Sequence, residues 1–179
     1  MQEIYQKIQK IKLPLWEDFP SMDLYVDQVV SYINQTLSFL DLEGKEMVIT
    51  KSMVNNYVKH SMVPQPIKKY YKPYHVGYLI VVCILKCCFS LKDISKMINI
   101  YRNMKDDHIE LHYNRFISIF EKNLKEIFLS NTLPNLTYES PSPEQQLMES
   151  AIRTVVYKIY SQSLLHSMSE WIYFKSKTI

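Results

Sequence analysis

The stretch of sequence that decides the fold is ITKSMVNNYVKHSMVPQPIKKYYKPYHVGYLIVVCILKCCFSLKDISKMI, residues 49–98. Its apolar residues recur at helical spacing in three successive segments, which prolines and polar residues separate. Thr50 stands at the N-cap position of the first segment, Pro73 fits the first turn of the second, and Ser90 can cap the third. The stretch therefore predicts three helices, with a short basic and aromatic connector at residues 68–72 that is either a loop or a small hairpin.

The regions on either side of this stretch also have helical patterns. Ser21 is the expected N-cap of a stripe that runs to Leu40, and Ser142 with Gln145 forms a capping box before the last helix. Only two glycines occur in the chain, which leaves few residues for the tight turns of a β-sheet. We expect an all-α protein. Further apolar stripes at helical spacing occur in residues 4–11, 22–40, 109–128 and 147–160.

Two helical regions are expected along the chain, residues 1–104 and residues 105–179, with a boundary near residues 105–107. The second region carries two long amphipathic helices, whose apolar stripes suit either an internal bundle or the interface of a homodimer. We expect it to serve dimerisation or the binding of an effector, an unknown small molecule held among its aromatic residues.

The stretch is also basic, although the net charge of the whole chain is only +3. No Asp or Glu occurs between Glu46 and Asp93. We therefore expect this region to attract an anionic partner. The lysines of the interval are Lys51, Lys59, Lys68, Lys69, Lys72, Lys86 and Lys92.

One face of the helix that follows Thr50 combines lysines with short polar side chains. Its members, at helical spacing, are Lys51, Ser52, Asn55, Asn56 and Lys59. Asn pairs with the edge of adenine, Ser reaches a base or a phosphate, and Lys neutralises phosphates. The face is typical of a helix that reads DNA, and the alternative is an ordinary solvated surface.

The order of motifs resembles the DNA-binding domain of MerR-type regulators. The matching pieces are YVKHSMVPQP, KKYYKPYHV and CFSLKDI, which resemble a recognition helix with its turn, a wing with a tyrosine-rich segment, and a later helix. The segment from residue 13 to about residue 98, with LPLWEDFPSMDLYVDQV, is similar to an uncharacterised bacterial domain-of-unknown-function family linked to such regulators. In this sequence Met62 and Phe89 stand where MerR-type proteins carry glycine.

The resemblance implies a MerR-like helix-turn-helix with a short wing in a sequence-specific transcription regulator. The helix after Thr50 would enter the major groove of double-stranded DNA, while the connector tracks the phosphates. The connector residues assigned to this contact are Lys68, Lys69, Tyr70 and Lys72.

Other residue groups give weaker signals. His108 and His112 lie one helical turn apart, but no third zinc ligand is evident. The three cysteines, Cys83, Cys87 and Cys88, lie in or beside an apolar run, where a thiol packs as a small hydrophobic group more often than it senses oxidants or metals. We expect no metal and no cofactor. His60 and His75 flank the connector and are candidates for contact with phosphate.

The sequence also bears on three further classes, namely secreted proteins, membrane proteins and enzymes. The first twelve residues lack the apolar core of a secretory signal, and no apolar run is long enough to span a bilayer. We therefore expect a cytoplasmic protein that does not bind membranes. No catalytic triad or carboxylate pair appears, so an enzyme is the weakest hypothesis. The chief alternative to a DNA-binding regulator is a helical adaptor that binds another protein through the same surface.

Overall fold

The computed structural model describes residues 2–41, 46–103 and 108–177. Within these ranges the chain forms seven α-helices and two short 3-10 helices, which confirms the all-α prediction. Extended pairing in this part of the chain is limited to two isolated bridges, Leu24 with Tyr71 and Ile67 with Tyr70. The elements are α1 (Gln2–Lys10), η1 (Trp16–Asp18), α2 (Val26–Thr36), η2 (Ser38–Leu40), α3 (Lys51–Lys59), α4 (Pro73–Leu85), α5 (Leu91–Arg102), α6 (Ile109–Ser130) and α7 (Pro143–Lys177).

Four of the helix starts predicted from capping residues and prolines are confirmed, those of α3, α4, α5 and α7. The hydroxyl of Thr50 accepts a hydrogen bond from the backbone N–H of Met53 at 3.3 Å, and Ser90 caps α5 in the same way. Pro73 is the first residue of α4. Ser142 and Gln145 bond each other reciprocally, as a capping box does. These short-range rules therefore predicted where α3, α4, α5 and α7 begin.

The start and the length of α2 were predicted wrongly. The helix begins at Val26 and not after Ser21, because the backbone of Leu24 is paired in both directions with Tyr71, at 3.0 and 2.8 Å. A residue held in an extended bridge cannot belong to a helix. The helix ends at Thr36, and the expected last turn is the separate element η2.

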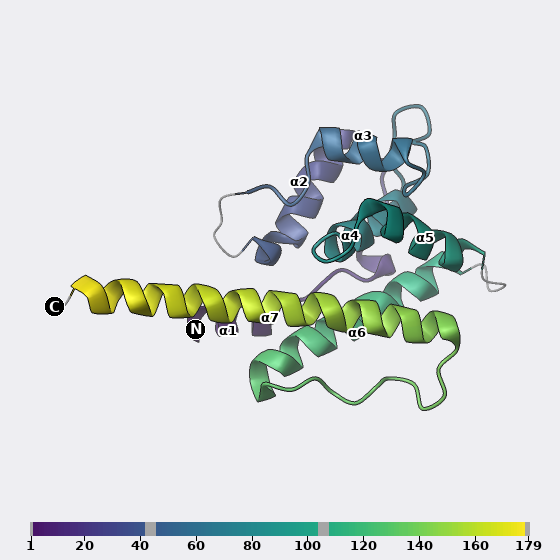
Figure 1. The fold of residues 1–179 in the computed structure, drawn as a ribbon. Coiled ribbons are helices and arrows are strands. Elements are labelled where there is room, and N and C mark those ends of the chain that lie inside the picture. Colours follow the sequence, from purple (N-terminus) through teal and green to yellow (C-terminus); the bar gives the residue numbers. More distant parts are fainter. Residues whose placement is uncertain (1, 42–45, 104–107, 178–179) are drawn as a thin grey trace.

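The helices form two layers (Figure 1). The upper layer in that view contains α2, α3, α4 and α5, and the lower layer contains α6 and α7, with α1 behind them. Helix α4 contacts α2 in its own layer and both α6 and α7 in the other. Most of its side chains are buried, which explains the nearly continuous apolar run from Val76 to Leu85. Helix α4 therefore contributes to joining the two layers.

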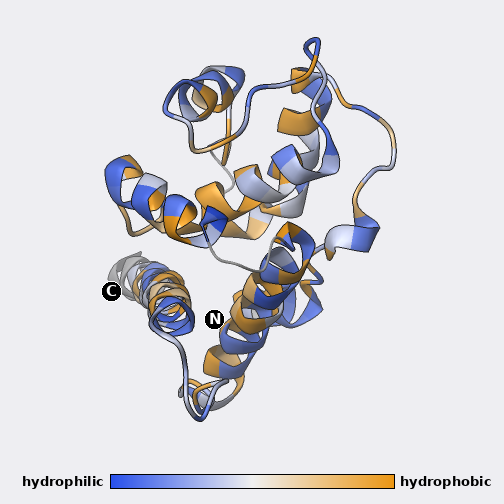
Figure 2. Cartoon of the chain, turned by 90° about the vertical axis from the view of Figure 1, so that its right-hand side faces the viewer, coloured by the Kyte–Doolittle hydropathy of each residue, from blue (hydrophilic) through white to orange (hydrophobic). Residues whose placement is uncertain are grey.

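The apolar stripes of α6 and α7 pack against each other within one chain. Phe120 and Leu124 of α6 and Val155 and Val156 of α7 are fully buried. Figure 2 shows hydrophobic and hydrophilic residues intermixed along both helices, as expected for amphipathic elements. The structure therefore uses these stripes for the internal bundle, which is the first of the two alternatives that the sequence left open.

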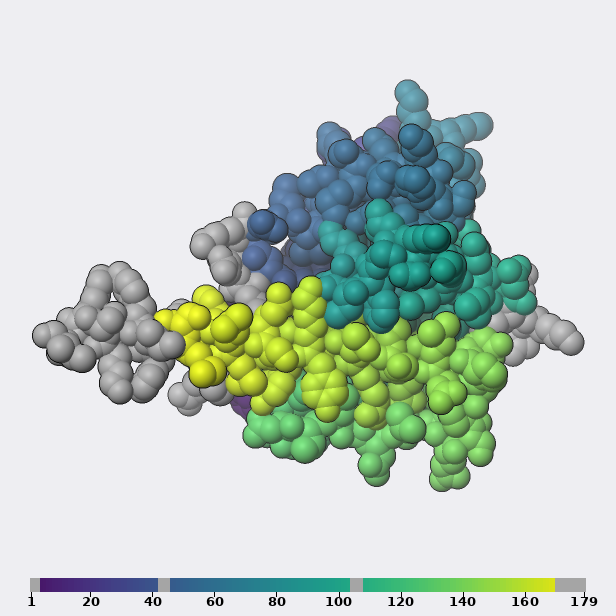
Figure 3. All heavy atoms as spheres, viewed as in Figure 1, coloured from purple at the N-terminus to yellow at the C-terminus, as the bar shows by residue number. Residues whose placement is uncertain are grey.

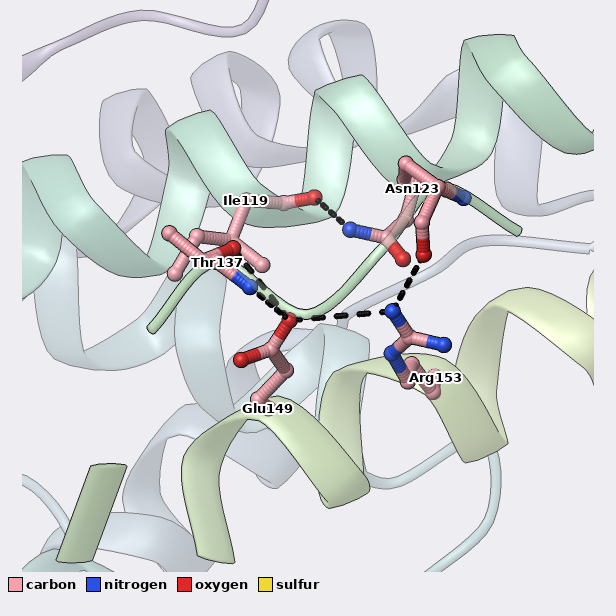
Figure 4. Close-up of polar contacts among 6 residues, drawn as sticks. Ile119, Asn123, Thr137, Glu149 and Arg153 are labelled. Atoms are coloured by element: carbon pink, nitrogen blue, oxygen red, sulfur yellow. Dashed lines mark hydrogen bonds and ion pairs between the residues drawn. The ribbon is translucent and has the colours of Figure 1, made fainter. Parts of the chain in front are cut away.

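A cluster of polar side chains holds the loop between α6 and α7 (Figure 4). Glu149, only 2% exposed, accepts hydrogen bonds from the backbone N–H of Thr137 at 2.8 Å and from its hydroxyl at 3.2 Å. Arg153 donates to the carbonyl of Pro134 and lies 3.8 Å from Glu149. Because a buried carboxylate needs such partners, this cluster fixes the loop against α7.

The core is one cluster of buried side chains that extends from Ile8 in α1 to Ile159 in α7. The expected boundary near residues 105–107 lies outside the described residues. Helix α6 contacts α1, η1 and α4, which belong to the other predicted region.

None of the helices in the described ranges combines the length and the apolar character that a membrane-spanning helix requires.

Candidate nucleic-acid interface

Helix α3 lies on the surface with its polar face outward. Val54, Tyr57 and Val58 form its buried face, and burial beside Cys83 of α4 raises the pKa of the Tyr57 hydroxyl. On the opposite face Lys51, Ser52, Asn55 and Lys59 are exposed and Asn56 is half-buried. The predicted periodicity of this helix is therefore correct.

The polar side chains at the centre of this face are not engaged by the rest of the described protein. The side-chain amides of Asn55 and Asn56 and the hydroxyl of Ser52 make no hydrogen bond to another described residue. Amides that are presented to solvent on a fixed helix can bond the edges of bases. The arrangement of α3 is therefore compatible with reading a groove.

The segment before α3 is held by Asn34 of α2. The side-chain oxygen of Asn34 accepts from the backbone N–H of Ile49 at 3.1 Å, and its amide nitrogen donates to the carbonyl of Ile49 at 2.8 Å. The same nitrogen donates to the carbonyl of Val30 in its own helix. Because Ile49 is fully buried, this clamp fixes where α3 starts relative to α2.

The C-terminal end of α3 is a Schellman motif centred on Ser61. The N–H of Met62 bonds the carbonyl of Tyr57 at 3.0 Å, and the N–H of Ser61 bonds that of Val58. Ser61 has a φ of 57°, in the left-handed region where glycine is favoured. The guanidinium of Arg102 in α5 donates to the carbonyls of both Ser61 and Met62, at 2.9 and 3.3 Å.

The basic connector is a hairpin with a two-residue turn. Ile67 and Tyr70 exchange two backbone hydrogen bonds, at 3.0 and 2.9 Å, around Lys68 and Lys69. These lysines have φ values of 49° and 73°. Positive φ at both central residues is the pattern of a type I′ turn, which favours Asn-Gly and similar pairs. The backbone is strained where two lysines occupy these positions, and their exposed side chains place two charges at the tip of the hairpin.

The base of the hairpin is fixed by His75 in the first turn of α4. Its Nδ1 accepts from the backbone N–H of Lys72 at 2.8 Å, and its Nε2 lies 3.1 Å from the carbonyl of Gln65. Because Nδ1 accepts a hydrogen bond, it carries no proton, and because a carbonyl can only accept, Nε2 carries the proton. The ring is therefore neutral. Burial is the main cause that lowers the pKa of His75 below 6.5. The prediction that His75 touches phosphate is wrong, because the side chain is fully buried.

Tyr70 joins the hairpin to the residue that precedes α2. Its ring lies 4.8 Å from the ring of Tyr25, and the two hydroxyls are 2.8 Å apart. The hydrogen bond with Tyr25 raises the pKa of Tyr70. The hydroxyl of Tyr70 therefore already has a hydrogen-bond partner within the protein, although the residue remains half-exposed.

Two of the lysines are paired with acids that lie outside the acid-free stretch of sequence. Lys51 forms an ion pair with Asp27 of α2, and Lys72 forms one with Asp23 at 2.7 Å. In the described residues, Lys59, Lys68 and Lys69 have no carboxylate within ion-pair distance. The positive charge of this surface is therefore concentrated at the end of α3 and at the hairpin tip.

Helix α3 and the hairpin lie at the end of the molecule opposite α6 and α7 (Figures 1 and 2). In Figure 3 residues 50–72, coloured blue, form the upper end of the face shown. The nine predicted contact residues thus occupy one end of the protein. Sequence reasoning missed the groups that hold this surface in place, namely Asn34, Ser61, His75 and Arg102, because each acts on a partner distant in sequence or through an unusual φ angle.

The other residue groups from the sequence are the three cysteines and the histidines His108 and His112. Burial raises the pKa of the Cys83 thiol to about 12 and also raises those of Cys87 and Cys88, so all three thiols are mostly protonated at neutral pH. His108 lies 3.7 Å from Glu110. Among the described residues, no group of three or more His, Cys, Asp or Glu side chains could hold a metal ion.

Comparison with known proteins places most of this structure in one family. Residues 14–127, from the segment after α1 to the last turns of α6, match the family described as Domain of unknown function (DUF1836). The chain belongs to the DUF1836 family. This family match does not link the chain to MerR-type regulators. No curated protein and no solved structure matches the chain.

Proposed function

We propose that this DUF1836 protein is a sequence-specific, DNA-binding transcription regulator. In this proposal α3 enters the major groove and the hairpin contacts the flanking phosphates. The observation that carries the proposal is the outward face of α3, where Asn55 and Asn56 present unbonded amides beside the exposed Lys59. Asparagine amides bond adenine in the major groove, and lysines bond phosphate.

The order of elements supports a winged helix-turn-helix of the MerR kind. Helices α2 and α3 are the two helices of the motif, the Ile67–Tyr70 hairpin corresponds to a short wing, and α4 and α5 follow it. Asn34 and Arg102 hold the two ends of α3. A reading helix needs such support, because base contacts depend on accurate placement.

The strained hairpin tip gives independent support. A left-handed conformation costs a residue with a side chain about 1–2 kcal/mol, and two such residues follow each other here. Strain of this kind concentrates at functional sites. Lysines at these positions present two exposed charges at the tip, where this proposal places the phosphate backbone.

The proposal includes a homodimer, because a single reading helix commonly acts through paired half-sites. The α6 and α7 stripes are used within the chain, so dimerisation has to use another surface. Leu165 and Met168 of α7 are 66% and 61% exposed and are the candidates. Analytical ultracentrifugation with and without DNA tests this part: a monomer under both conditions contradicts it.

Selection of duplexes from a random pool, followed by a salt titration, tests the main proposal. We expect one sequence motif to be enriched, and we expect the affinity to fall with salt, with a log–log slope of about −0.9 for each phosphate contact. Enrichment of no motif, or binding that does not change with salt, overturns it and favours a protein-binding adaptor.

A further inference from the structure

A cavity of about 170 Å³ lies between the two layers of the fold. It is bounded by α4 and α5 from the upper layer, by α6 and α7 from the lower layer, and by η1. The lining residues used below are Trp16, Tyr78, Tyr101, Arg102, His108 and Tyr113. The cavity is distinct from the face of α3.

The interior of the cavity is apolar, although tyrosines line it. The hydroxyl of Tyr113 donates to the carbonyl of Pro14 at 2.9 Å, and that of Tyr101 donates to the carbonyl of Glu144 at 2.6 Å. Both hydroxyls are therefore occupied, and the two residues present their rings to the cavity. Trp16 adds a third ring, 6.1 Å from that of Tyr113 in an edge arrangement. A flat, apolar ligand fits such walls.

The polar groups of the lining are basic or neutral. Arg102 and His108 line the cavity, and no Asp or Glu is among the lining residues that the structure describes. The guanidinium of Arg102 lies over the ring of Tyr78, 4.6 Å from its centre, and is exposed. Its described hydrogen bonds, to Tyr78, Ser61 and Met62, use three of five N–H donors. A guanidinium binds a carboxylate through charge-assisted hydrogen bonds that are often bidentate.

We propose that this cavity binds a compact aromatic carboxylic acid, a single ring with a carboxylate directed at Arg102. The volume sets the size, because an apolar cavity of about 150 Å³ holds a benzene ring. The ring lies between the aromatic walls, and the carboxylate stays at the rim beside the guanidinium. The proposal needs no reaction, because the ligand only binds.

Arg102 also connects this site to α3. Arg102 lines the cavity, and its guanidinium holds the carbonyls of Ser61 and Met62, which form the turn directly after α3. A carboxylate that draws Arg102 towards the cavity weakens these two bonds and changes the support of α3. This regulatory consequence rests on the proposed function, whereas binding of the acid does not.

Titration of the full chain with benzoate, without DNA, tests the site. We expect saturable binding by calorimetry and chemical-shift changes at the methyl groups of Met97, Ile98 and Ile109, which line the cavity. Benzyl alcohol, of similar size but neutral, should bind at least about tenfold more weakly, because it lacks the charge-assisted contact. No saturable binding of benzoate, or equal binding of the two compounds, overturns the proposal.

Two substitutions locate the binding. Val81→Phe fills the cavity from α4 and should abolish benzoate binding, whereas Arg102→Met should remove the preference for benzoate over benzyl alcohol. Arg115→Met, an exposed position on α6 outside the lining, is the matched control and should bind as the unsubstituted chain does. Unchanged binding by folded Val81→Phe contradicts the site. If a variant fails to fold, the comparison of benzoate with benzyl alcohol on the unsubstituted chain still tests the proposal.

The DNA titration is then repeated with and without saturating benzoate. A change in DNA affinity supports the coupling through Arg102, and an unchanged affinity overturns the coupling alone. Failure of the proposed function would appear instead as the absence of any selected duplex, with benzoate binding intact.

Discussion

Asn34 of α2 bonds both backbone groups of Ile49, at 3.1 and 2.8 Å, and so joins α2 to the residue that precedes the α3 cap. This contact gives both backbone groups of a buried residue the hydrogen-bond partners that they need. It lets the chain cross from one helix to the next without leaving polar groups of Ile49 unbonded. The orientation of the exposed α3 face depends on it.

The first prediction concerns this clamp. Asn34→Ala leaves the N–H and the carbonyl of a buried residue without partners, and we expect the free energy of unfolding to fall by about 1–3 kcal/mol. Gln35→Ala, an exposed neighbour in the same helix, should change it by less than about 0.5 kcal/mol. Urea unfolding of both variants measures the difference, and equal values for the two would show that the clamp does not stabilise the fold.

The second prediction separates stability from binding at the hairpin tip. Lys69→Gly removes the left-handed strain at a position with a φ of 73°, and we expect the free energy of unfolding to rise by about 1 kcal/mol. The same change removes a phosphate contact, so the salt slope of DNA binding should become less steep by about 0.9.

Lys69→Asn is the control for this experiment, because Asn tolerates the left-handed region but carries no charge. It should weaken DNA binding as Lys69→Gly does. If Lys69→Gly bound DNA as well as the unsubstituted chain, the tip would have no role in the contact.

The third prediction concerns pH. His75 is neutral in the folded protein, and its lowered pKa means that the unfolded chain binds more protons below pH 6.5. Its contribution to stability is therefore complete above pH 6.5 and is lost as the pH falls towards the folded value. The charged groups and rings that face it are Lys72, whose charge lowers the pKa further, and the neighbouring Tyr71 and Tyr74.

Unfolding measured from pH 8 to pH 5 checks this claim. His75→Gln should be less stable than the unsubstituted chain at pH 8, and its stability should fall less steeply below pH 6.5. His60→Gln, at an exposed position after α3, should retain the original slope. A His75→Gln profile parallel to that of the unsubstituted chain would mean that His75 is not the group responsible.

The fourth prediction concerns base recognition by α3. Asn55→Ala should weaken binding to the selected duplex by about 1–3 kcal/mol, the usual worth of a good bidentate contact, and should barely change binding to a scrambled duplex. Lys122→Ala, on the exposed surface of α6, should change neither. Fluorescence anisotropy with the two duplexes measures both effects; an equal loss on both duplexes would reassign Asn55 to a non-specific role.

Much of this fold could be predicted from local sequence rules. Caps such as Thr50 and Ser90 and a first-turn proline, Pro73, act within one helical turn, so the sequence shows their positions directly. The beginning of α2 could not be predicted in this way, because the bridge between Leu24 and Tyr71 joins residues far apart in the chain. Tertiary pairing overrode the local signal of Ser21.

The candidate site could be predicted only as a set of outward residues. The period of α3 placed Asn55 and Lys59 on one face, and the structure agrees. The ion pairs of Asp23 and Asp27 could not be foreseen, because an acid-free interval of sequence does not exclude acids that approach from another part of the chain. The role of Arg102 likewise depends on how α5 lies against the turn after α3.

The most direct test of the central claim is an NMR titration of the labelled protein with its selected duplex. The account predicts that amide shifts change chiefly in residues 50–72, which contain α3 and the hairpin, and that the amides of α6 keep their positions. Changes centred on α6 and α7, with residues 50–72 unaffected, would contradict it.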